Sequence, residues 1–192
     1  MTFIQLARKV RDHLGQQHRY EHCVRVARMA ENLARRHGAD PAKARLAGML
    51  HDLARLYPAA RLISECERRA IPIDDFSRDH PVVLHAPLSA SLARELFGVN
   101  DAEVLSAIGK HTLGAERMSP LDCVVYLADA LEPGRGYPER EALEELARRD
   151  LAGAMHATIA SSLRYLSARQ LPVAPQTAAA MKTWEVSTGG RS

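Results

Sequence analysis

The segment Ala47-Gly48-Met49-Leu50-His51-Asp52 closes an apolar helical stretch with two adjacent side chains that can bind metal. Neutral imidazole and carboxylate are both ligands of divalent transition metals. Consecutive helix positions point about 100° apart, so His51 and Asp52 reach one ion only if it lies at the helix surface between them. Because a carboxylate has two oxygens, Asp52 could also bridge to a second ion. The dipeptide gains meaning if other helices supply further ligands.

Helical signals extend from this segment along the chain in both directions. Thr2 with Gln5 is the pattern of a capping box. Asp40-Pro41 and Ser119-Pro120 each join an N-cap residue to a proline at the first helical position. Apolar residues recur with a period near 3.6, and no segment alternates convincingly with the period of two typical of a strand. We predict an all-α fold, a single-domain helical bundle.

The expected helices cover about 2–14, 18–37, 41 to an end between 51 and 55, a short stretch after Pro58, a stretch from Pro81 or His85 to 97, 100–111, 119–129, and a long helix or helix pair over 139–170. A loop is expected over 71–79. From Leu171 onward Pro, Ala, Ser, Thr and Gly dominate. We therefore expect a helical domain over 1–170 and a flexible C-terminal tail over 171–192.

Composition places the chain among globular proteins. A length of 192 residues suits one domain, and 46% of the residues are hydrophobic and 26% charged. No apolar run approaches the length of a transmembrane helix, and the N-terminal residues lack the pattern of a signal peptide. The three cysteines are odd in number and widely spaced, which favours buried thiols in a reducing cytoplasm over a disulfide framework.

The charge and the aromatic content of the chain indicate what kind of partner it binds. The formal net charge is +3, aromatic residues make up 5% of the chain, and basic residues are spread along helices, often beside acids. This is poor material for a surface that tracks a long nucleic acid. A small anionic substrate is the better expectation.

Potential metal ligands occur on five predicted helices. They are His22, His51, Asp52, His85, His111 and Asp129. A His or Asp among apolar neighbours is costly to bury without a partner. Divalent ions at a common point would satisfy all six.

Each ligand also has an ordinary structural interpretation. His22 alone is more readily a hydrogen-bonded core histidine, and Asp129 alone is as readily the partner of an arginine. His18 shares the face of His22, and His80 competes with His85 for the same role. The ordered set is more informative than any member.

The series His, His-Asp, His, His, Asp resembles the HD-domain metal-dependent phosphohydrolases, and more narrowly the YqeK family of symmetrical bis(5'-nucleosyl)-tetraphosphatases. The resemblance covers about residues 19–165. The motifs that carry it are His18-Arg19-Tyr20-Glu21-His22, Ala47-Gly48-Met49-Leu50-His51-Asp52, Leu84-His85-Ala86-Pro87, Ile108-Gly109-Lys110-His111-Thr112-Leu113-Gly114 and Tyr126-Leu127-Ala128-Asp129-Ala130-Leu131-Glu132-Pro133-Gly134-Arg135.

The resemblance implies a bacterial enzyme that cuts diadenosine tetraphosphate into two ADP with a metal-activated hydroxide. It implies two divalent transition-metal ions, iron or else manganese, held by the six ligands named above. In that arrangement His51 and Asp52 are catalytic, with Asp52 as the bridge. Residues flanking the ligands become candidates for binding the polyphosphate, although each is also a plausible surface residue. They are Arg19, Arg55, Lys110, Thr112 and Arg135.

Two departures from the family pattern affect details of the site. Arg55 stands where relatives usually have lysine, and Gly109-Lys110 precedes His111 where relatives often carry other residues. Arginine meets phosphate through a planar fork rather than a point charge, so the phosphate contacts are expected to differ. Neither departure removes a ligand.

Two alternative functions remain open at this stage. One is an HD-family phosphohydrolase acting on another nucleotide, and the other is a non-catalytic, metal-bound helical regulatory protein. The expected partner is a small dinucleoside polyphosphate, with no long nucleic acid and no membrane. The sequence allows a homodimer and does not determine the oligomeric state.

Overall fold

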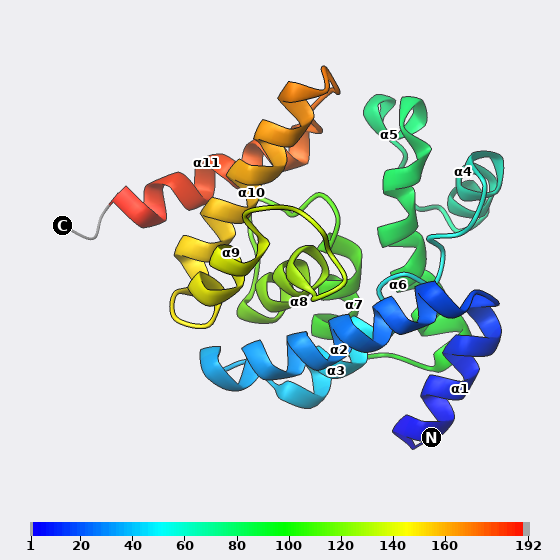
Figure 1. Ribbon diagram of the computed structural model, residues 1–192. Coiled ribbons are helices and arrows are strands. Elements are labelled where there is room, and N and C mark those ends of the chain that lie inside the picture. The colour runs from blue at the N-terminus through cyan, green and yellow to red at the C-terminus, as the bar shows by residue number, and fades with distance from the viewer. Residues whose placement is uncertain (1, 190–192) are drawn as a thin grey trace.

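The computed structural model describes residues 2–189, and every regular element within that range is a helix (Figure 1). The elements are α1 Phe3–Leu14, α2 Gln17–His37, α3 Pro41–Leu50, α4 Ala59–Arg68, α5 Asp75–Asp79, the 3-10 helix η1 Pro81–Leu84, α6 His85–Phe97, α7 Ala102–Lys110, α8 Pro120–Leu131, α9 Arg140–Ala147, α10 Leu151–Ala168 and α11 Pro175–Gly189. The all-α prediction is confirmed.

Helix α8 forms the centre of the bundle. It is mostly apolar around its circumference, and residues 121–128 are all buried. A helix with this pattern needs neighbours around its whole circumference. In Figure 1 it lies in the middle, with α2 and α3 on one side, α9 and α10 on another, and α7 behind. Its C-terminal end, with Asp129, therefore lies among several other helices.

Helices α2 and α3 pack with unusually close backbones because of Gly48. A Cβ atom at this position would lie 2.8 Å from the Cα atom of Ala27 and 3.0 Å from its nitrogen. Real side chains essentially never approach a backbone that closely, so the contact requires glycine. The close approach brings the end of α3 with His51 and Asp52 near the face of α2 that carries His22.

The predicted helix starts are observed. The Thr2 backbone N–H donates to Gln5 Oε1 at 2.9 Å, completing the capping box. Asp40 accepts from the Ala42 backbone N–H at 2.8 Å, and Ser119 forms a second capping box ahead of α8. Such caps depend on residues only two or three positions away, which explains why sequence patterns identify them.

Several boundaries differ from the prediction. Residues 75–79, expected in a loop, form the short helix α5. Both suggested starts near residue 81 are used, because Pro81 opens η1 and His85 begins α6. The long segment is a helix pair, and α10 starts where the Asp150 side chain accepts a hydrogen bond from Gly153 N at 3.1 Å.

The prediction of a flexible tail is wrong over residues 175–189, which form helix α11. Ala174 and Ala180 are buried, and the Thr177 hydroxyl donates to the Leu113 carbonyl oxygen at 2.9 Å. A helix forms here because alanine, frequent in this segment, is the best helix former and Pro175 suits a first helical position. Residues 190–192 of the predicted tail lie outside the described part of the chain.

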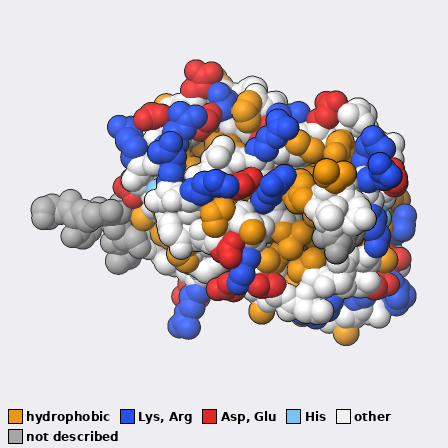
Figure 2. Space-filling view, turned by 90° about the horizontal axis from the view of Figure 1, so that it is seen from below, with side chains coloured by type: hydrophobic (Ala, Val, Ile, Leu, Met, Phe, Trp, Pro, Cys, Tyr) orange, Lys and Arg blue, Asp and Glu red, His pale blue; other side chains and the backbone are white. Residues whose placement is uncertain are grey.

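The distribution of surface charge and the state of the cysteines match what the composition indicates. Figure 2 shows the face that carries α2 and α3, where Lys and Arg side chains alternate with acidic and hydrophobic ones instead of forming a continuous band. Within residues 2–189, no helix combines the length and the apolar character needed to cross a bilayer. The three cysteines are buried and free, as predicted: Cys23, Cys66 and Cys123.

Candidate metal centre

All six predicted ligands meet at one place in the bundle. They come from α2, the end of α3, the start of α6, the residue after α7 and the end of α8. The four histidines and Asp52 are each at most 5% exposed, and Asp129 is the most exposed of the six. Residues up to 107 positions apart in the chain thus share one buried cluster.

One half of the cluster surrounds His22 and His51. Their Nε2 atoms lie 3.2 Å apart. Asp129 Oδ1 lies 3.1 Å from Nε2 of His22 and 3.7 Å from that of His51. Asp52 Oδ2 lies 3.6 Å and 3.5 Å from the same two nitrogens. Two nitrogens and two carboxylate oxygens therefore converge on a common point.

The other half of the cluster surrounds His85 and His111. Their Nε2 atoms lie 3.1 Å apart. Asp52 Oδ1 lies 3.3 Å from Nε2 of His85 and 3.7 Å from Nε2 of His111. Asp52 therefore lies between the two halves and offers one oxygen to each.

Every histidine of the cluster is anchored through its Nδ1 atom. The partners are carbonyl oxygens three residues earlier for His51, His85 and His111, at 2.7, 2.5 and 2.7 Å, and the Glu132 carboxylate for His22, at 3.1 Å. Because a carbonyl or carboxylate only accepts, Nδ1 must carry the proton. The neutral ring then presents its Nε2 lone pair to the cluster, as metal-binding histidines do.

The two pairs of facing Nε2 atoms, 3.2 and 3.1 Å apart, indicate that a cation belongs in this site. Two such lone pairs can face each other at about 3 Å only with a cation beside them, either a proton or a metal ion. The surrounding carboxylates add negative charge that a cation would neutralise. A mixed set of imidazole nitrogens and carboxylate oxygens suits iron, manganese or zinc better than calcium. The residues therefore fit a transition-metal centre.

The protonation of the cluster follows from burial and from its charges. Burial, together with charge on His51 and His85, lowers the pKa of His111 to about 3. Burial alone would raise the pKa of the Asp52 carboxyl, but His51 and His85 outweigh it and hold this pKa well below its usual range. Burial would likewise lower the pKa of His51, but Asp52 and Asp129 raise it. Proton and metal therefore compete for His51.

Glu132 completes the site and was not identified from the sequence. Besides His22, its carboxylate accepts from Arg25 Nε at 2.5 Å and from the Gly134 backbone N–H at 2.6 Å. Burial would raise its pKa, but these donors lower it to about 2, so the group stays anionic. Its position three residues after Asp129 was an available signal, since one helix turn places both near the same end of α8.

A cleft of about 260 Å³ opens onto the cluster. Four of the five predicted phosphate-binding residues line it: Arg19, Arg55, Thr112 and Arg135. Arg19 Nη1 donates to Asp52 Oδ2 at 2.8 Å, whereas its Nε is buried without a hydrogen-bond partner among the described residues. Arg135 pairs with Asp129, and the Thr112 hydroxyl lies 3.2 Å from Nε2 of His85 and 3.0 Å from that of His111.

Lys110, the fifth predicted phosphate-binding residue, lies elsewhere. Its ammonium donates to the buried Asp122 carboxylate at 2.8 Å and to the Arg117 carbonyl oxygen at 2.9 Å, and it does not line the cleft. The reason is its helical phase, because the position before His111 points about 100° away from it. Lys110 stabilises the start of α8 instead.

The structure places His80 and His18 outside the cluster and places His85 and His22 inside it. His80 packs against the ring of Phe76, with ring centroids 4.7 Å apart, and His85 occupies the cluster. His18 is exposed at the start of α2. The choice of His85 and His22 as ligand candidates agrees with this geometry.

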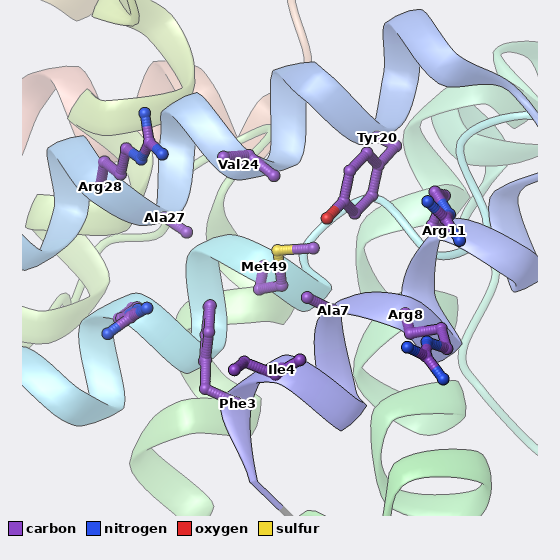
Figure 3. A pocket seen from close by; sticks show the side chains of 11 residues that line it. Phe3, Ile4, Ala7, Arg8, Arg11, Tyr20, Val24, Ala27, Arg28 and Met49 are labelled. Atoms are coloured by element: carbon purple, nitrogen blue, oxygen red, sulfur yellow. The ribbon is translucent and has the colours of Figure 1, made fainter.

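A second groove on the surface is distinct from the metal cluster. It lies between α1, α2 and α3 and measures about 420 Å³. Figure 3 shows Tyr20 and Met49 on one side of it and Phe3 and Ile4 on α1 opposite, with Arg8 near the edge. None of the six candidate ligands lines it. This groove is therefore separate from the candidate metal cluster.

Comparisons with known proteins agree with this geometry. The HD domain family matches residues 19–134. The symmetrical bis(5'-nucleosyl)-tetraphosphatase of Bacillus subtilis (strain 168) is 36% identical over 161 residues, which is 84% of this chain and 86% of that protein. The protein of the same name from Halalkalibacterium halodurans is 35% identical over 170 residues, 88% of this chain and 90% of that protein.

A solved structure shows the same fold. It is described as a predicted HD superfamily hydrolase involved in NAD metabolism from Clostridium acetobutylicum. It matches with a TM-score of 0.92 and 28% identity over 97% of this chain and 98% of that chain. HD domains are metal-dependent, and the His/Asp cluster could hold the metal. The chain belongs to the HD domain family, in the branch that contains the symmetrical tetraphosphatases.

Proposed function

We propose that this protein hydrolyses diadenosine tetraphosphate symmetrically, giving two ADP. The observation that carries the proposal is the position of Asp52, which offers one oxygen to each of two histidine pairs at the floor of a cleft lined by arginines. The similarity to curated symmetrical tetraphosphatases, 36% identical over 84% of the chain, supports the substrate. Neither alternative function has comparable support.

The ligand set supports two divalent transition-metal ions, which we propose to be iron, with manganese as the alternative. His22, His51 and Asp129 would hold one, His85 and His111 the other, and Asp52 would be shared. Bound there, such ions activate water and neutralise phosphate charge. His51 and Asp52 are the residues that we propose as central to catalysis, since both are buried in the cluster and Asp52 lies between its two halves.

The arginines of the cleft match the charge of the substrate. A tetraphosphate carries several negative charges, and Arg19, Arg55 and Arg135 face it from separate segments. The buried Nε of Arg19 has no partner among the described residues, so a phosphate oxygen could satisfy it. The structure supports a phosphate-binding role for these three residues and not for Lys110.

The protein's own contribution to the reaction is positioning and charge neutralisation. In phosphoryl transfer, the attacking water and the leaving group lie in line across the phosphorus atom. Arg19 on Asp52 and Arg135 on Asp129 approach the cluster from α2 and from the loop after α8. Guanidinium groups placed there stabilise negative charge as it develops on the departing ADP. The Thr112 hydroxyl adds a neutral donor beside His85 and His111.

Hydrolysis in oxygen-18 water tests the proposal. One of the two ADP products should carry the label on its terminal phosphate, and no AMP or ATP should form early. An AMP and ATP mixture would mean asymmetric cleavage and would contradict the substrate assignment. Faster turnover of a mononucleotide would favour the other phosphohydrolase, and no turnover with iron or manganese would favour the regulatory protein. The Asp52→Asn variant serves as the inactive control.

We also propose a cytoplasmic location and a homodimeric assembly. Three buried free thiols support a reducing compartment. Cell fractionation with an antibody against the chain tests the location, and recovery in a membrane or secreted fraction would contradict it. Sedimentation equilibrium measures the oligomeric state directly.

A further inference from the structure

A further groove, of about 720 Å³, lies beside the metal cleft and is separate from the groove between α1, α2 and α3. One wall is the segment after α8, including Tyr137 and Glu139. The other wall is one face of α10, where the lining residues recur at helical spacing as Thr158, Ser161, Ser162 and Tyr165. A volume of this order is typical of small-molecule sites.

Arg135 joins this groove to the metal cleft, because its side chain lines both. Its Nε donates to the Asp129 backbone carbonyl at 2.9 Å, and Nη2 contacts the Asp129 carboxylate. The guanidinium is thereby fixed at the boundary between the two spaces. A molecule whose phosphates lie in the metal cleft can extend past Arg135 into the groove.

The groove has aromatic walls suited to a flat ring. Tyr165 is 55% exposed, and the Arg169 guanidinium lies 4.7 Å from the centre of its ring. The Tyr137 hydroxyl donates to the Ala130 carbonyl oxygen at 3.2 Å, which holds that ring against the end of α8. Aromatic side chains of this kind stack on nucleobases in many nucleotide-binding proteins.

The groove also contains an unsatisfied polar group. Thr158 is 2% exposed, and its hydroxyl has no hydrogen-bond partner among the described residues. Most buried hydroxyl groups are hydrogen-bonded, so this one calls for a ligand or an ordered water. Arg164 also lines the groove and donates to Glu139 at 3.0 Å.

We propose that this groove holds one nucleoside of the dinucleotide substrate. The base lies against Tyr165, and a polar atom of the nucleoside pairs with the Thr158 hydroxyl. The inference rests on the proposed function, because it assumes that the phosphates occupy the cleft beside Arg135. Tyr165 and Thr158 would then distinguish a nucleotide from a polyphosphate without a nucleoside.

Calorimetric titration of the metal-loaded protein with ADP and, separately, with inorganic pyrophosphate tests the assignment. Tyr165→Leu keeps apolar bulk but removes the ring, and it should weaken ADP binding about tenfold while leaving pyrophosphate binding within twofold. Tyr57→Leu is the matched control, since Arg61 also lies over its ring, at 3.7 Å, and Tyr57 does not line the groove. It should change neither affinity.

Thr158→Val separates a ligand contact from a structural role. Because the hydroxyl has no hydrogen-bond partner within residues 2–189, removing it should leave the melting temperature unchanged or higher. ADP binding should nevertheless weaken at least threefold. Unchanged ADP affinity in both Tyr165→Leu and Thr158→Val would overturn the proposal, as would equal losses for ADP and pyrophosphate. Failure of the proposed function is a separate result, seen as no hydrolysis of diadenosine tetraphosphate by the unaltered protein.

Discussion

Replacing Gly48 by alanine tests whether the approach of α2 and α3 positions the candidate metal ligands. The new Cβ would lie 2.8 Å from Ala27 Cα and 3.0 Å from Ala27 N, whereas ordinary contact begins at 3.4 Å. Both are backbone atoms, so the helices themselves must separate by roughly 0.6 Å. His51 moves with Gly48, because its Nδ1 donates to the Gly48 carbonyl oxygen at 2.7 Å.

The expected magnitude combines two opposing terms. Alanine in a helix gains about 1 kcal/mol over glycine through backbone entropy. Overpacking a core typically costs about 1–3 kcal/mol. We therefore expect a net loss of up to about 2 kcal/mol, which corresponds to a fall of up to about 8 °C in the melting temperature of a chain of this size. Metal affinity should fall several-fold, since His22 and His51 move apart.

Gly109 provides the matched control. It precedes His111 by two positions on α7, and a Cβ there would meet only Ala90 Cβ at 3.9 Å. Gly109→Ala should therefore stabilise the protein by up to about 1 kcal/mol. Thermal unfolding of the metal-free proteins and metal content after dialysis are the measurements. Equal stabilisation by both substitutions, with full metal retention, would refute the close-packing argument.

Four further predictions follow from the site and the core. Asp52→Asn should retain the helical fold but lose most metal and activity, because the amide cannot bridge two cations; near-normal turnover would reject the bridging role. His85→Ala should lower metal content far more than His80→Ala, and the reverse ranking would reassign the ligand. Glu132→Gln should weaken metal binding about 10–100-fold in a chelator competition, because an anionic partner of the metal-binding imidazole is lost; unchanged affinity would contradict this. Burial, and after it the charge of Asp122, raises the pKa of the Cys123 thiol to about 12. Above about pH 9 the thiol therefore ionises in the unfolded chain but not in the folded one, and the free energy of unfolding should fall by up to about 1.4 kcal/mol per pH unit. A Cys123→Ala variant that loses the same stability at alkaline pH would argue against this cause.

Local signals were sufficient wherever the deciding contacts are local. The caps at Thr2, Asp40 and Ser119 depend on hydrogen bonds to residues two or three positions away, and all three were predictable. The candidate metal ligands were also predictable, because they are His and Asp residues next to apolar helical stretches. The family resemblance then selected His85 over His80, a choice that spacing alone left open.

The sequence by itself determined the all-α fold, most helix starts and the six residues that meet at the cluster. Only the tertiary structure decided how they pair, because this depends on how closely helices distant in the chain approach, as at Gly48 and Ala27. Glu132 reaches His22 across 110 positions, and Lys110 turns toward Asp122 because of its helical phase. Such contacts depend on the angle and spacing between packed helices, which composition and periodicity do not encode.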